Sequence, residues 1–220
     1  MTHKLESNNS KYVNKKVKLK IALISLFLST STYASSFDFY KQHLSFPADG
    51  QEWSHTDGSP KHKLFTRSTS DIFGSKTIWY INDKHALDLN KNWNDDGSDA
   101  FNSDRNKPVL ASMSGSVIYV DKTGLGFVII KHSDNEWATG YMHMRDINVN
   151  VGDSVREGDA IGKISNRGTG NHHLHYSLYR IIYMGPFYQK VNNVFYDDKV
   201  KLQSVDLLDG FVNFADLHLF

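Results

Sequence analysis

The sequence predicts an all-β protein with an antiparallel β-sheet or β-sandwich core and a mixed N-terminal extension. Short runs rich in β-branched and aromatic residues follow one another along the chain, separated by turn-forming pairs such as Ser114-Gly115 and Thr123-Gly124. Few stretches show a helical period, and strands at this density favour antiparallel pairing. The strand-like runs are 77–81, 86–89, 108–111, 116–120, 126–130, 138–143 and 173–179.

Composition excludes several classes of protein. Of the 220 residues, 40% are hydrophobic and 22% are charged, which is typical of a folded chain and not of a disordered, coiled-coil or multi-span membrane protein. The formal net charge of +1 gives no reason to expect a nucleic-acid partner. The absence of cysteine excludes disulfides, thiolate metal sites and cysteine nucleophiles.

The first 34 residues resemble a secretory signal peptide. Six lysines and a single glutamate occupy residues 1–20, the apolar run 21–28 follows, and small residues end at Ala34. The apolar run is much shorter than the roughly 20 residues of a spanning helix, so an uncleaved membrane anchor is the weaker alternative. We therefore expect an exported protein, periplasmic or secreted, with no stable membrane insertion after cleavage. The mature chain divides into an N-terminal extension (35–70), a core (71–185) and a C-terminal extension (186–220).

Residues 91–107 are polar and rich in Asp, Asn and Gly, which predicts a solvated surface loop between two strands. Four acidic residues there, among them Asp104, raise calcium binding as an alternative. Their spacing does not match the alternating carboxylates of a helix-loop-helix calcium site, so the solvated loop is preferred.

Histidines carry the chemistry of this chain. In a strand, alternate residues point to the same side, so His173 and His175 are expected to project together. A second strand ends in Tyr141-Met142-His143, and the same alternation places Tyr141 and His143 on one face. Two imidazoles on one face of a strand can bind a metal, or one can bind it while the other transfers protons. A pair of structural surface histidines is the alternative.

An aspartate adds to this pattern. Asp88 lies in the otherwise apolar run 86–89, where a carboxylate is costly to bury without a cation or hydrogen-bond donors. One aspartate and two strand histidines make a three-ligand zinc site with an open position. No His-Glu-x-x-His sequence is present, so the helical zinc-protease arrangement is excluded.

The sequence resembles the lysostaphin-type zinc metallopeptidases, bacterial cell-wall endopeptidases that include staphylolysin. The resemblance runs from about Phe46 to Tyr179, and each motif is weak alone, but together they occur in the order typical of the family. They are Ala86-Leu87-Asp88-Leu89-Asn90, Pro108-Val109-Leu110-Ala111-Ser112, Gly126-Phe127-Val128-Ile129-Ile130, Tyr141-Met142-His143, Gly158-Asp159-Ala160-Ile161-Gly162 and His173-Leu174-His175-Tyr176.

The resemblance implies roles for individual residues. Asp88 and His175 match zinc ligands, while His173 and His143 match the pair that handles the water and the oxyanion. Many members place the remaining ligand four residues before the aspartate, where this chain has Lys84, with His85 one residue later. Others take it from an upstream loop after a Pro, a Gly-Gln and a Trp, a pattern that favours His62 slightly over His85.

The resemblance implies a zinc metalloendopeptidase that hydrolyses peptide bonds of peptidoglycan stem peptides or cross-bridges. Zn²⁺ is the expected cofactor, and peptidoglycan or a peptide is the expected partner; the sequence indicates no oligomeric state. A non-catalytic peptidoglycan-binding or hydrolase-activating relative of the same fold is the alternative function. A biotinyl-carrier module is disfavoured, because the nearest hairpin tip, Ser112-Met113-Ser114-Gly115, lacks the lysine that such a carrier needs.

Overall fold

The computed structural model describes residues 36–49, 53–56, 65–70, 76–91, 103–191, 194–215 and 217–219. It confirms the all-β class, because most of the described elements are strands and most strand pairs are antiparallel. The chain divides into two units, Met1–His43 and Leu44–Phe220. A helix over 36–43 is the described part of the first unit, and all described strands belong to the second. No described helix has the length and apolar character needed to cross a membrane. The predicted signal peptide (1–34) lies outside the described residues.

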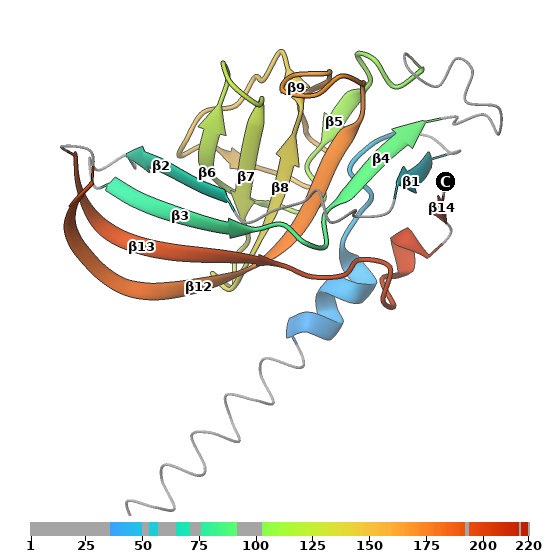
Figure 1. The fold of residues 1–220 in the computed structure, drawn as a ribbon. Coiled ribbons are helices and arrows are strands. Elements are labelled where there is room, and N and C mark those ends of the chain that lie inside the picture. The colour runs from blue at the N-terminus through green and yellow to red at the C-terminus, as the bar shows by residue number, and fades with distance from the viewer. Residues whose placement is uncertain are drawn as a thin grey trace, which may run out of the picture. The chain divides into compact units, whose positions relative to one another are not determined.

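Two sheets form the second unit (Figure 1). The larger one has the order β10-β6-β7-β8-β12-β13-β3-β2, with β4, β1 and β14 attached beside β12; the smaller one has the order β5-β11-β9. The strands of the larger sheet are β1 (Trp53–Thr56), β2 (Phe65–Ser70), β3 (Lys76–Asn82), β4 (Leu87–Lys91), β6 (Gly115–Asp121), β7 (Phe127–Lys131), β8 (Trp137–Met142), β10 (Ser154–Val155), β12 (Leu174–Val191), β13 (Val194–Ser204) and β14 (His218–Leu219). The smaller sheet contains β5 (Pro108–Leu110), β9 (Met144–Arg145) and β11 (Ala160–Ile164), and a short 3₁₀ helix, η1 (Val212–Phe214), precedes β14.

Strand β12 organises the larger sheet. Its first residues pair with β8 along one edge and with β4 along the other, so that His175 is opposite both Met142 and Asp88. On that second edge, β12 pairs with β4 up to Tyr176 and with β13 from Tyr179 onward. Strands β12 and β13 then continue together as the long curved ribbon seen in Figure 1. The turn between β3 and β4 lies where this exchange of partners occurs, since the His85 backbone N–H donates to Ser204 Oγ at the end of β13. This arrangement places the β3–β4 turn beside the site-bearing part of β12.

Segments on both sides of the predicted core are strands of the same sheet. Strand β1 pairs with β4, and β2 pairs with β3. From the C-terminal side, β13 pairs with β3 in parallel and β14 pairs with β1 in parallel. The sequence pattern did not predict these pairings, because they join residues far apart in the chain.

Apolar side chains fill both faces of the larger sheet. On one face Ala138, Met142 and Tyr179 pack with Trp79, Ile81 and Leu202 into a buried cluster. On the other face Tyr141 and Tyr176 are in contact, with ring centroids 5.3 Å apart, and Tyr141 Oη accepts from the backbone N–H of Ser112 just after β5. The smaller sheet therefore lies against this second face. Trp53, Trp79 and Trp137 are buried, so these tryptophans contribute to packing and not to an exposed groove.

Asp104 departs from the predicted solvated loop. Its exposed fraction is 0%, whereas the polar composition of 91–107 predicted contact with water. The turn 103–107 is fastened to the end of β11 by hydrogen bonds from Asn106 N–H to the Ile164 carbonyl and from Ile164 N–H to the Lys107 carbonyl. These bonds bring the end of the polar segment into the fold. The other acidic residues of that segment lie outside the described residues.

Candidate metal centre

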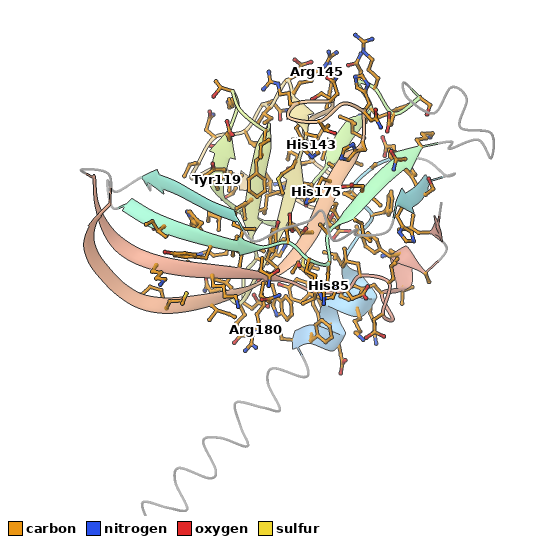
Figure 2. The ribbon with its side chains drawn as sticks, viewed as in Figure 1. His85, Tyr119, His143, Arg145, His175 and Arg180 are labelled. Atoms are coloured by element: carbon orange, nitrogen blue, oxygen red, sulfur yellow. The ribbon has the colours of Figure 1, made fainter. Side chains whose placement is uncertain are left out.

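Four of the predicted site residues lie together where β12, β4 and β8 meet. The pairing of β12 with β4 places His175 directly opposite Asp88, and His175 Nδ1 lies 2.9 Å from Asp88 Oδ1. His173 Nε2 lies 3.5 Å from the same oxygen. The His143 ring centroid is 4.6 Å from that of His173 and 5.7 Å from that of His175, both edge to face. Figure 2 shows His143 and His175 close together, toward the end of the molecule that carries Arg145.

His175 is held between two carboxylates. Its Nε2 lies 2.5 Å from Asp83 Oδ2, on the opposite side of the ring from the contact with Asp88. An ionised carboxylate has no proton to donate and can only accept hydrogen bonds. Both ring nitrogens of His175 therefore donate in the metal-free protein. Burial acts to lower the pKa of His175, but the charges and hydrogen bonds of Asp83 and Asp88 raise it to about 10.

Asp83 is the residue that sequence reasoning missed. It directly follows β3, its exposed fraction is 1%, and its Oδ1 accepts from Ser177 Oγ at 2.6 Å and from Tyr179 Oη at 2.7 Å. Burial acts to raise its pKa, but the His175 charge and these hydrogen bonds hold the pKa below its ordinary value. One signal was available, because His175, Ser177 and Tyr179 alternate along β12 and place three polar groups on one face of a buried strand. Such a row needs a shared polar partner.

His143 reaches the cluster through a kink in the backbone. Strict alternation predicted that His143 shares a face with Tyr141, and this prediction is wrong: Tyr141 packs on Tyr176, while His143 meets His173. His143 has a φ of 64°, in the left-handed region, and it separates β8 from β9. Its backbone N–H donates to the Leu125 carbonyl and its own carbonyl accepts from Ser165, which fixes the kink. Non-glycine residues held in this region are often part of functional sites.

The His143 ring has a defined tautomer. Its Nδ1 lies 2.6 Å from the Arg167 carbonyl oxygen, which only accepts, so Nδ1 carries the proton and donates it there. Burial, followed by the neighbouring charges on His173 and His175, lowers the pKa of His143 to about 4. The resting ring is therefore neutral near pH 7, with its Nε2 lone pair available to a proton.

The two alternatives for the remaining zinc ligand differ in their placement. His85 is in the turn before β4, and Figure 2 shows it well separated from His143 and His175. His62 lies outside the described residues. His55 is a different histidine of the same region; it pairs with Leu89, one residue out of phase with Asp88, so it belongs to the opposite face of the sheet.

Donor atoms in this cluster suit a metal such as zinc. His175 Nδ1 and Asp88 Oδ1 converge, and metal-bound histidines generally donate their other ring N–H to a carboxylate or carbonyl, as His175 does to Asp83. Within the described ranges, no group of three or more His, Asp or Glu side chains is arranged to hold a metal ion. Two converging donor groups are present, and a metal site would require another residue.

Part of the chain matches a known protein family. Residues 95–192 match the model of Peptidase family M23. This range contains His143, His173 and His175, while Asp83 and Asp88 precede it.

Two curated relatives resemble part of the chain. One is the lipoprotein NlpD/LppB homolog of Pseudomonas aeruginosa, 34% identical over 77 residues, which are 34% of this chain and 26% of that protein. The other is the cell division protein DipM of Caulobacter vibrioides, 32% identical over 75 residues, which are 32% of this chain and 12% of that protein. The chain thus matches about a quarter or less of the length of either relative.

Two solved structures are also similar to part of the chain. Lysostaphin from Staphylococcus simulans is 25% identical with a TM-score of 0.36, and the match covers 44% of this chain and 37% of that one. The M23 metalloprotease pseudoalterin is 18% identical with a TM-score of 0.41, and the match covers 74% of this chain and 97% of that one.

Proposed function

We propose that the chain is a zinc-dependent metalloendopeptidase of Peptidase family M23, the lysostaphin-type family whose model residues 95–192 match. The substrate class that we propose is peptidoglycan, cut in its stem peptides or cross-bridges. The observation that carries the proposal is the convergence of Asp88 from β4, His173 and His175 from the start of β12, and His143 from the kink after β8.

Asp88 and His175 are the proposed zinc ligands within the described residues. Both are supported by the 2.9 Å approach of their donor atoms and by Asp83, which takes the second ring nitrogen of His175. Zinc held there would supply Lewis-acid polarisation of the scissile carbonyl and a water of lowered pKa. His175 would release its Nδ1 proton on binding the metal and keep its Nε2–H on Asp83.

We assign the remaining ligand to His62. Strand β1 ends at Thr56, opposite Asp88, and β2 begins at Phe65, opposite Ile81 near the Asp83 turn. The stretch that joins them contains His62, six residues after Thr56. Six residues reach up to about 20 Å, so His62 is within range of Asp88. His85 is disfavoured, because it lies well apart from His175 (Figure 2).

His173 and His143 are the proposed proton-transfer residues. His173 Nε2, near Asp88, would take a proton from the attacking water. His143 would face the developing oxyanion through Nε2, because its Nδ1–H is bound to the Arg167 carbonyl.

Digestion of purified peptidoglycan tests the proposed activity. Wild-type protein should release peptide fragments, identified by mass, and a chelator should stop the release. His173→Ala and His143→Ala should retain zinc but cut about a hundred- to ten-thousand-fold more slowly. His172→Ala removes the neighbouring histidine of the same strand end and should cut at the wild-type rate. Equal rates for all four proteins would contradict the assignment.

Zinc content tests the ligands. His62→Ala and Asp88→Ala should each lose most bound zinc, and His85→Ala should bind one zinc per chain as wild type does. If His85→Ala loses zinc and His62→Ala retains it, the assignment of the remaining ligand is wrong.

A second candidate function is a non-catalytic relative that binds peptidoglycan or activates another hydrolase. It is favoured by Lys84, which stands where many members carry a zinc histidine. Wild-type protein that binds peptidoglycan without zinc and without cleavage would establish this alternative.

We also propose that the protein acts after export, in the periplasm or outside the cell. The basic and apolar start of the sequence and the small-residue site ending at Ala34 support this localisation.

A further inference from the structure

We propose that Asp83 is a positioning residue for the metal centre, fixing the orientation and the proton of His175 so that Nδ1 faces the metal. The inference rests on the proposed zinc function and concerns a residue outside the segment that matches the family. Asp83 Oδ2 lies 2.5 Å from His175 Nε2. Among the described residues, Asp83 forms no hydrogen bond or ion pair with His143, His173 or Asp88.

Its carboxylate is fully engaged. Oδ2 faces His175 alone, while Oδ1 accepts from Ser177 Oγ and Tyr179 Oη. Two hydroxyl donors on one oxygen prevent the carboxylate from rotating, which leaves the other oxygen aimed at the imidazole. Oδ1 therefore anchors the carboxylate, and Oδ2 positions the His175 ring.

The backbone supplies these partners by regular spacing. His175, Ser177 and Tyr179 are alternate residues of β12, so all three project from the face that meets the β3–β4 turn. The turn is closed by the hydrogen bond from Ala86 N–H to the Asp83 carbonyl and is fixed to β13 by Ser204 Oγ. A rigid strand and a fastened turn thus define the Asp83–His175 distance.

The chemical consequence concerns the His175 ring. Once Nδ1 has released its proton to bind the metal, the hydrogen bond from Nε2–H to the buried Asp83 carboxylate keeps the remaining proton on Nε2 and leaves the lone pair on Nδ1, the atom beside Asp88. Loss of the acceptor would let the ring rotate or carry its proton on Nδ1. Removal of such an outer partner typically costs about 10- to 100-fold in metal affinity.

Zinc affinity of Asp83→Asn, measured by competition with a chromogenic chelator, tests the proposal. We expect about 10- to 100-fold weaker binding than wild type with the fold retained, because the amide is close in size to the carboxylate but accepts with one oxygen only. Asp104→Asn is the matched control, since it removes another buried carboxylate whose oxygens bond to no other residue in the described part of the chain, and should bind zinc as wild type does.

The hydroxyl anchors give a second set of variants in case Asp83→Asn fails to fold. Tyr179→Phe and Ser177→Ala should each weaken zinc binding by a few fold, because one of the two bonds that hold Oδ1 is lost. Tyr141→Phe is matched to Tyr179→Phe, since Tyr141 is also buried but its hydroxyl bonds to Thr139 and Ser112 instead. Tyr141→Phe should leave zinc affinity unchanged.

A spectroscopic measurement on the metal-free protein separates this proposal from the proposed function. The His175 Nε2 proton of wild type should give a downfield, slowly exchanging resonance that couples to the ring nitrogen and disappears in Asp83→Asn. If wild type binds no zinc but shows this signal, the zinc function fails and the positioning contact stands. If wild type binds zinc, and Asp83→Asn and Tyr179→Phe match its affinity, the positioning role is overturned. A resonance unchanged in Asp83→Asn overturns it equally.

Discussion

His143 shows how a single backbone angle changes the outcome of a strand pattern. Alternation predicted the same face for His143 and Tyr141, and it would have directed His143 away from His173 and His175. The left-handed φ of 64° reverses this direction and completes the cluster. No side-chain periodicity reveals such an angle, because it is imposed by hydrogen bonds from distant residues, Leu125 and Ser165.

Replacement of His143 by glycine and by alanine should separate strain from chemistry. Both variants should lose hydrolysis by about a hundred-fold or more, because both lack the imidazole. His143→Gly should be more stable than His143→Ala by about 1 kcal/mol, since glycine adopts the left-handed region without a Cβ penalty. Urea unfolding of the two variants measures the difference. Equal stabilities would show that the kink is not strained.

Asp104 predicts a pH dependence of stability. Neither of its carboxylate oxygens has a hydrogen-bond partner on another residue in the described part of the chain, and burial raises its pKa to about 7. The unfolded chain has the ordinary value, 3.8, so the folded state binds the extra proton between these values. Its contribution to stability is therefore complete below about pH 4 and is lost as pH rises through about 7.

The variant Asp104→Asn measures this contribution. The wild-type free energy of unfolding should fall by on the order of 2 kcal/mol between pH 5 and pH 8 because of this group, allowing for screening by water near the polar segment. Asp104→Asn should show a smaller fall over the same interval. Parallel pH profiles of the two proteins, determined by urea unfolding, would mean that Asp104 is ionised in the fold at both pH values.

Strand β12 is the element whose beginning the sequence predicted well and whose extent it did not. The run 173–179 was assigned from period-two alternation, and its facing pair His173 and His175 lies on one side as expected. The continuation to Val191 and the pairing with β13 were not foreseen, because partners that are distant in sequence leave no local pattern. Asp83 was missed for the same reason, since its partners are more than ninety residues away.

Gly140 supports this element by leaving room for Tyr179. A Cβ at Gly140 would lie 2.5 Å from Tyr179 Cε2, so Gly140→Ala should displace the ring whose hydroxyl holds Asp83. We expect a loss of about 1–3 kcal/mol in stability and weaker zinc binding. Gly170→Ala is the control, because a Cβ there meets nothing within 4 Å. A Gly140→Ala protein as stable as the control would contradict the close packing.

The whole molecule combines a family segment with strands from both sides of it. The segment 95–192 contains three of the four clustered site residues, while Asp88, Asp83 and the strands β1 to β3 come from before it. The fold class followed from strand density and turn signals, and the resemblance to the family that residues 95–192 match followed from the order of motifs. The assembly of the outer strands on β12 and β13 could not follow, because register between distant strands depends on tertiary packing.

Export gives a prediction for the intact chain. If the signal is cleaved after Ala34, the mature protein begins at Ser35, immediately before the described helix at 36–43. Sequencing of the N-terminus of protein recovered from the periplasm or the medium should therefore start at Ser35. Exported protein that still begins at Met1 would refute cleavage.

The central claim is that one zinc, held by Asp88 and His175 with His62, makes this protein a peptidase. Titration of the metal-free protein with zinc, with release of peptides from purified peptidoglycan followed at each step, tests it most directly. Hydrolysis should rise in proportion to added zinc and saturate at about one equivalent per chain, and His175→Ala should remain inactive throughout. Hydrolysis that is independent of zinc, or zinc binding at one equivalent without any release of peptides, would contradict the claim.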